Sequence, residues 1–209
     1  MHISSIRLSL ASVTTAAAVA LSLVAAPAQA QQQQQGRVRG VVRLAAEYGG
    51  EKIGEFTYSD GSTPDVIAGG GLLVTGGAAV TMLTRGANAL DAQVNVGVKY
   101  RTIPPANNQD ASWLRFPVEG LIFWRTPVGL RLGAGATVHL HNVLAASGDV
   151  LNDRVEFENT PGVLLQAEYV RRNIAFDVRY TAMQYSVADA SGSVDASSIG
   201  AGLSVFFGR

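Results

Sequence analysis

The sequence contains no cysteine among its 209 residues. This absence excludes a disulfide framework, a thiolate metal site and a cysteine nucleophile. Charge is also scarce, because Asp, Glu, Lys and Arg make up 15% of the chain and the 16 basic residues balance the 16 acidic ones. No global basic field therefore favours nucleic acid as a partner. After residue 30, no apolar run approaches the ~20 residues that a membrane helix needs, which excludes a helical membrane protein.

The first 30 residues differ in composition from the rest and have the pattern of a cleavable signal peptide. A basic residue, Arg7, precedes an apolar stretch from Leu8 to Ala26, and Pro27-Ala28-Gln29-Ala30 follows as a cleavage site of the Ala-x-Ala kind. Cleavage after Ala30 would leave one more acid than bases. An uncleaved signal anchor is disfavoured, because Ser and Thr dilute the apolar stretch. Residues 31–36 form a Gln-rich spacer with nothing to bury.

The remaining residues, 37–209, show almost no helical periodicity. Apolar and polar residues instead alternate in segments of about ten residues that are separated by turn residues, which is typical of β-strands. The eight predicted strands cover residues 37–48, 66–83, 90–100, 113–124, 130–141, 162–171, 174–185 and 196–207.

In each segment one face is apolar and the other is polar, because successive side chains of a strand point to opposite sides of a sheet. In residues 90–100, for example, Leu, Ala, Val and Tyr alternate with Asp, Gln, Asn, Gly and Lys. Alternation alone also fits a soluble sandwich or a lipocalin-like barrel. The connections favour a membrane barrel, because short turns alternate with long polar loops as in outer-membrane barrels. The short turns are 84–89, 125–129 and 171–173, and the long loops are 49–65, 101–112, 142–161 and 186–195.

Two further features fit this interpretation. The first long loop contains a predicted hairpin, in which residues 53–58 run into an Asp60-Gly61 turn. Aromatic residues of the apolar face fall near the ends of the predicted strands and suggest two interfacial girdles. The predicted girdle residues are Tyr48 and Tyr100 on the loop side, with Trp124, Tyr169 and Phe207 on the turn side.

The last segment, Ser198-Ile199-Gly200-Ala201-Gly202-Leu203-Ser204-Val205-Phe206-Phe207, resembles the C-terminal strand of small outer-membrane β-barrel proteins of the OmpA and OmpX kind. The resemblance covers residues 37–209, and the stretches 112–119 and 178–185 resemble uncharacterised members. It implies an eight-stranded antiparallel up-and-down transmembrane β-barrel. It also implies that the assembly machinery of the outer membrane reads the terminal aromatic residue, although Gly208 and Arg209 follow it here.

The polar face is predicted to line the lumen of this barrel. The predicted lumen-lining residues are Arg39, Arg43, Glu47, Asp91, Lys99, Arg115, Glu119, Arg131, His139, Glu168, Asp177 and Arg179. We expect Arg43 with Glu47, Arg115 with Glu119 and Asp177 with Arg179 to neutralise one another, because a buried ion needs a partner. An eight-stranded barrel is only wide enough for a filled interior or one small ligand, so a plugged lumen is favoured over a pore.

No enzymatic site is predicted, and no cofactor. Lipid A deacylases use a His-x-Ser pair, but His139 is followed by His141 on the same strand face and then by Val143, so the serine is absent. Two histidines could bind a metal only with a third ligand, which the sequence does not fix. The long loops hold eleven of the 16 acidic residues. Weak candidates for a divalent-cation site among them are Asp149, Asp153, Glu156 and Glu158.

The sequence thus predicts a non-enzymatic protein of the bacterial outer membrane with a structural or surface-interaction role through acidic extracellular loops. One alternative is a narrow porin-like channel for small polar solutes. The other is a soluble periplasmic ligand-binding barrel, which requires Val94, Leu132 and Val178 to point inward. The expected partners are outer-membrane lipid, lipopolysaccharide and the barrel-assembly machinery, with no nucleic acid, and we expect a monomer.

Overall fold

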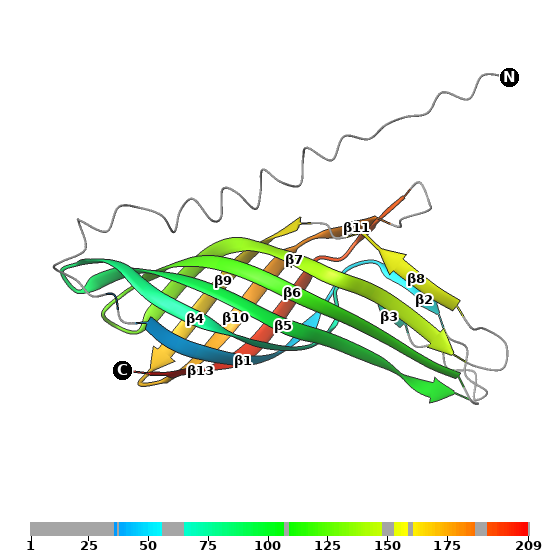
Figure 1. The fold of residues 1–209 in the computed structure, drawn as a ribbon, viewed down its shortest axis with the longest axis horizontal. Coiled ribbons are helices and arrows are strands. Elements are labelled where there is room, and N and C mark those ends of the chain that lie inside the picture. Colours follow the sequence, from blue (N-terminus) through cyan, green and yellow to red (C-terminus); the bar gives the residue numbers. More distant parts are fainter. Residues whose placement is uncertain are drawn as a thin grey trace, which may run out of the picture. The chain divides into compact units, whose positions relative to one another are not determined.

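Eight antiparallel strands form a closed barrel in a computed structural model of the protein. Figure 1 shows the arrangement of these strands. The structure describes residues 36, 38–55, 65–106, 109–147, 153–158, 161–186 and 192–208. The barrel strands are β1 (Val38–Tyr48), β4 (Gly71–Arg85), β5 (Asn88–Ala106), β6 (Gln109–Arg125), β7 (Leu130–Ser147), β9 (Pro161–Arg171), β10 (Ile174–Ala182) and β13 (Ser198–Phe207). The predicted signal peptide and nearly all of the spacer lie outside the described residues and stay a prediction.

Neighbouring barrel strands follow one another in the sequence, and the pairing of the first with the last closes the ring. β1 pairs with β13, from Gly40 opposite Phe207 to Tyr48 opposite Ile199. The order continues as β4, β5, β6, β7, β9 and β10, and β10 returns to β13. This topology confirms the predicted eight-stranded up-and-down barrel. We call the end with the connections β4–β5, β6–β7 and β9–β10 the turn rim and the opposite end the loop rim.

Three strands extend further toward the loop rim than the sequence predicts. β5 and β6 remain paired as far as Ala106 opposite Gln109, so most of the predicted loop 101–112 is strand. A ladder through Pro104 and Pro105 is unusual, because proline lacks the N–H that a ladder requires. Pro104 and Pro105 fall at a register shift between Ile103 and Ala106, where the ladder is interrupted. β7 likewise runs to Ser147 and pairs with β8 (Asp153–Phe157).

Short strands gather at the loop rim. β2 (Lys52–Glu55) pairs with β3 (Asp65–Ile67), and β11 (Gln184–Ser186) pairs with β12 (Ser193–Asp195). A hairpin therefore lies in the first long loop as expected, while its predicted Asp60-Gly61 turn falls outside the described residues. No helix that is long and apolar enough to cross a membrane occurs in the described part of the chain.

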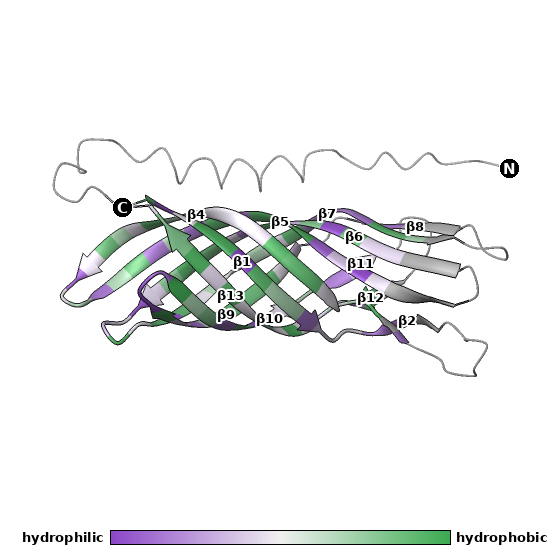
Figure 2. Ribbon diagram, turned by 90° about the horizontal axis from the view of Figure 1, so that it is seen from below, coloured by the Kyte–Doolittle hydropathy of each residue, from purple (hydrophilic) through white to green (hydrophobic). Residues whose placement is uncertain are grey.

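The exterior of the barrel is apolar, and the interior is charged. Apolar residues recur along the barrel strands (Figure 2), and Val94, Leu132 and Val178 are 59%, 42% and 56% exposed. Arg43, Asp91 and Arg131 are instead buried. This inverted arrangement contradicts the soluble periplasmic alternative, because a water-soluble barrel would bury its apolar face. The solvent of the outer face is therefore lipid.

Candidate functional site

The predicted lumen residues come from six of the eight barrel strands, all but β4 and β13, and they meet inside the barrel. Period-2 alternation directs them inward from each strand. Eleven of the twelve are buried, and Arg39 at the turn rim keeps 24% of its side chain exposed. Thr75 supplies a buried polar side chain from β4.

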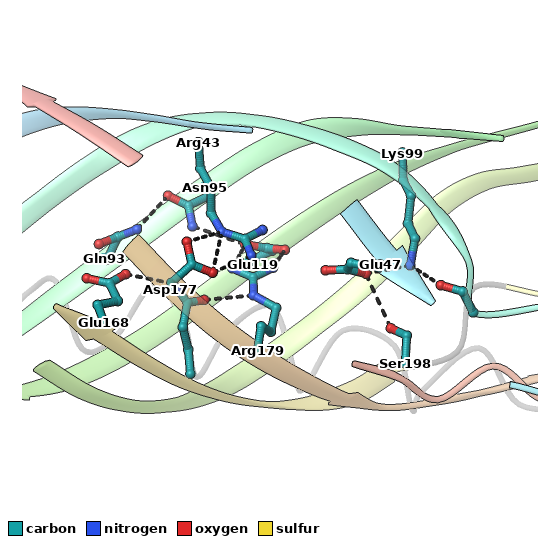
Figure 3. Close-up of polar contacts among 12 residues, drawn as sticks. Arg43, Glu47, Gln93, Asn95, Lys99, Glu119, Glu168, Asp177, Arg179 and Ser198 are labelled. Carbon is teal, nitrogen blue, oxygen red and sulfur yellow. Dashed lines mark hydrogen bonds and ion pairs between the residues drawn. The ribbon is translucent and has the colours of Figure 1, made fainter. Parts of the chain in front are cut away.

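Two arginine–carboxylate pairs occupy the middle of the lumen (Figure 3). The Arg43 guanidinium donates from Nε to both carboxylate oxygens of Asp177, at 3.1 and 3.0 Å, and from Nη2 to Oδ1 at 2.6 Å. Arg179 donates from Nη1 and Nη2 to the two oxygens of Glu119, at 2.5 and 3.1 Å. Asn95 donates to the same carboxylate at 3.0 Å. Side chains from different strands thus fill the centre of the barrel.

The predicted partners within one strand were wrong. Arg43 binds Asp177 of β10 rather than Glu47, and Arg179 binds Glu119 of β6. Arg43 and Glu47, like Arg115 and Glu119, are four residues apart on a strand and therefore about 13 Å from each other, which is beyond the reach of direct contact. Side chains on neighbouring and facing strands of a narrow barrel are closer.

On the loop side of this centre, two cations hold the chain segment that precedes β4. Lys99 donates from Nζ to Glu47 Oε2 and to the carbonyl oxygen of Gly69, both at 2.6 Å. Arg115 donates to the carbonyl oxygens of Ala68 and Gly70, at 2.8 and 2.6 Å. The three bonds to backbone carbonyl groups fix residues 68–70 against the lumen and satisfy oxygens that would otherwise be buried without partners.

An aromatic cap lies beside this segment at the loop rim. It consists of Trp113, Phe157 and Tyr185, packed with Ala68, Met183 and Ala196. The ring centroid of Trp113 is 5.2 Å from that of Phe157 and 5.7 Å from that of Tyr185. The polar atoms of the cap also have partners, since Trp113 Nε1 donates to Asn142 Oδ1 and the Tyr185 hydroxyl bonds His139 Nδ1, both at 2.6 Å. Burial raises the pKa of the Tyr185 phenol.

Sequence reasoning missed this cap. Trp113 lies two residues before Arg115 and shares the inward face of β6 with it, so the alternation of side chains could have predicted that Trp113 points inward. Phe157 and Tyr185 come from β8 and β11, whose placement depends on how the loops fold back. The cap and the charge network together fill the lumen on its loop side.

At the turn rim, three arginines surround one aspartate. Asp91 lies 3.8 Å from Arg39, 3.0 Å from Arg125 and 3.5 Å from Arg131. Arg131 also forms an ion pair with Glu168. The guanidinium carbon of Arg131 stands 4.0 Å from the ring centroid of Phe123, which adds a cation–π contact.

The two histidines do not share a face, contrary to prediction. His139 is buried, whereas His141 is exposed beside Phe116, with its ring centroid 5.8 Å from the phenyl centroid. His141 has a φ of 48° and lies where the β6–β7 register shifts. A bulge of this kind reverses the alternation of side chains beyond it, which single-strand periodicity does not reveal.

The predicted acidic cluster supplies no metal centre in the described part of the chain, where no three His, Asp or Glu side chains lie close enough to hold an ion. Asp153 begins β8, Glu156 and Glu158 are exposed, and Asp149 lies outside the described residues.

The predicted girdle residues all lie on the exposed outer face. Tyr48 ends β1 at the loop rim, and Tyr100 lies opposite Leu72 at the same level. Trp124, Tyr169 and Phe207 lie at or near the turn-side ends of β6, β9 and β13.

The fold and the polarity of its surfaces define the class of protein, a small bacterial outer-membrane β-barrel. No protein-family model matches the sequence, and no curated protein matches it. Among solved structures, the chain is similar to Ail, the attachment invasion locus protein of Yersinia pestis, in complex with the heparin analogue sucrose octasulfate. The TM-score is 0.50 at 12% identity, covering 83% of this chain and 100% of that one.

Two further structures have lower scores. Neisserial surface protein A has a TM-score of 0.43 at 17% identity, covering 83% of this chain and 98% of that one. The N-terminal β-barrel domain of Pseudomonas aeruginosa OprF has a TM-score of 0.39 at 12% identity, covering 83% and 100%. The likeness to Ail concerns the fold, and together with the apolar exterior it assigns the protein to the outer membrane.

Proposed function

We propose that this protein is a non-enzymatic scaffold of the outer membrane, whose plugged barrel carries a surface for interaction at the loop rim. The observation that carries the proposal is the filling of the lumen. Buried ion pairs occupy its centre, and the aromatic cap covers its loop side. This filling favours a scaffold over the alternative of a narrow channel.

The loop rim is acidic, and its charge indicates the kind of partner that it fits. Among the described residues, the exposed acids at this rim are Glu51, Asp65, Glu156, Glu158 and Asp195. Lys52, the exposed base beside them, forms an ion pair with Asp65 at 2.5 Å. A surface of this sign attracts cationic groups and repels anionic ones. We therefore propose a cationic partner, in contrast to the sulfated sugar in the Ail complex.

Binding of two probes to the refolded barrel tests this proposal. Calorimetry should detect poly-lysine binding that weakens with salt, because a Debye length of about 10 Å at 0.1 M screens exposed charges. The double variant Glu156→Gln/Glu158→Gln should bind poly-lysine less tightly than the native chain. The control variant Arg85→Gln, at the turn rim, should bind poly-lysine as tightly as the native chain. Binding of sucrose octasulfate without binding of poly-lysine would overturn the proposal.

The remaining partners belong to the same proposal. Lipopolysaccharide and outer-membrane lipid would surround a monomeric barrel, and the assembly machinery would engage β13 at its outward Phe207. The exposed position of Phe207 is compatible with such an engagement.

A further inference from the structure

Apart from Lys52, the exposed charges of the described residues are segregated by sign between the two rims. The exposed acids lie at the loop rim, as given above. The turn rim carries exposed arginines instead, namely Arg85, Arg171 and Arg172. The two acids nearest to the turn rim, Asp91 and Glu168, are buried inside the barrel. The outer surface of the turn rim is therefore cationic.

The arginines are spread around the rim. Arg85, Arg125 and Arg171 are the last residues of β4, β6 and β9, the strands that lead into the three short turns. The β4–β5 and β9–β10 turns lie on opposite sides of the barrel, separated by β1 and β13 in one direction and by β6 and β7 in the other. Arg125 points into the barrel and forms an ion pair with Asp91. The outward-facing arginines at the strand ends are therefore Arg85 and Arg171.

Arg171 and Arg85 point outward, toward the membrane. Arg171 follows Tyr169 by two residues, and Arg85 follows Leu83 by two residues, so each shares the lipid-facing side of its strand. Both therefore stand just beyond the edge of the apolar belt, at the level where aromatic and basic side chains meet lipid head groups. Within the described residues, neither forms an ion pair.

We propose that this arginine collar, Arg85, Arg171 and Arg172, binds the phosphate groups of anionic phospholipids in the leaflet around the turn rim. A guanidinium presents paired N–H donors that match phosphate oxygens. Placement on opposite sides of the barrel fits a surrounding leaflet, whereas a protein partner would contact one side. The collar is independent of the proposed loop-rim partner, because the two surfaces lie at opposite ends of the barrel.

The test is the lipid selectivity of the full barrel refolded into phosphatidylcholine vesicles. Electron spin resonance of spin-labelled lipids measures how much phosphatidylglycerol is preferred over phosphatidylcholine at the protein surface. We expect a preference of up to about fivefold at each arginine, the equivalent of ~1 kcal/mol per basic residue near an anionic surface. The preference should fall at high salt.

Variants separate the collar from other sources of selectivity. Arg85→Gln/Arg171→Gln/Arg172→Gln should remove most of the preference, the matching lysine variant should retain part of it, and Lys52→Gln at the loop rim should leave it unchanged. Unchanged selectivity in the glutamine variant would overturn the proposal. So would binding of soluble polyaspartate to the collar without any preference for phosphatidylglycerol, which would indicate a soluble anionic partner instead.

Discussion

The ion pair between Arg43 and Asp177 gives the sharpest prediction about the lumen. Three donor–acceptor distances of 2.6 to 3.1 Å join the two groups, and their side chains are 1% and 0% exposed. Asp177→Asn leaves an uncompensated guanidinium in a buried site, and removing one partner of such a pair costs about 3–5 kcal/mol. This is a large share of the ~5–15 kcal/mol that stabilises a typical domain.

Urea unfolding of the refolded barrel, followed by tryptophan fluorescence, measures this cost. Asp177→Asn and Arg43→Met should each lower the free energy of unfolding by about 3 kcal/mol or more. The double variant should lose clearly less than the sum, because it removes both charges. Lys52→Met, which breaks the exposed pair with Asp65, is the control and should cost at most about 1 kcal/mol. A loss below about 1 kcal/mol for Asp177→Asn, or strict additivity in the double variant, would refute the reasoning.

Two further predictions concern packing and pH. Gly202→Ala should destabilise the barrel by about 1–3 kcal/mol, because the added Cβ would lie 2.8 Å from a carboxylate oxygen of Asp177. Gly76→Ala is the control in the same unfolding assay and should be near neutral, because there is open space around Gly76. Hydrogen bonds from Ser197 lower the pKa of Asp195 below its usual value of 3.8. The hydrogen bond from the Ser197 amide to the Asp195 carboxylate is therefore fully formed above pH 3.8. It is lost as the pH falls through the lowered pKa of Asp195. The protection factor of the Ser197 amide, which is the exchange rate corrected for its intrinsic pH dependence, should therefore fall at acid pH in the native chain. An Asp195→Asn variant that reproduces the native pH profile would contradict this assignment.

The sequence could predict the barrel because the side-chain alternation of a strand is a local property. The number of strands, their polar and apolar faces and the position of the short turns all depend on residues that are close in the chain. The segment 90–100 illustrates this, since its inward Asp91 and Lys99 are buried and its outward Val94 is exposed.

The features that could not be predicted depend on register and on contacts between distant segments. The partners of Arg43 and Arg179 follow from which strands face each other across the lumen. The orientation of His141 follows from a bulge, and the continuation of β5 through Pro104 and Pro105 follows from a register shift. The aromatic cap requires β8 and β11 to fold over the end of the barrel.

Ion conductance in planar lipid bilayers tests the central claim, a membrane barrel with a filled lumen, most directly. The full mature chain is inserted, and a heat-dependent gel shift confirms that it is folded. Because side chains from facing strands occupy the lumen and the aromatic cap covers its loop side, we predict no steady openings across the applied voltage range. Steady, ion-selective openings of a defined conductance would contradict the account and would favour a channel.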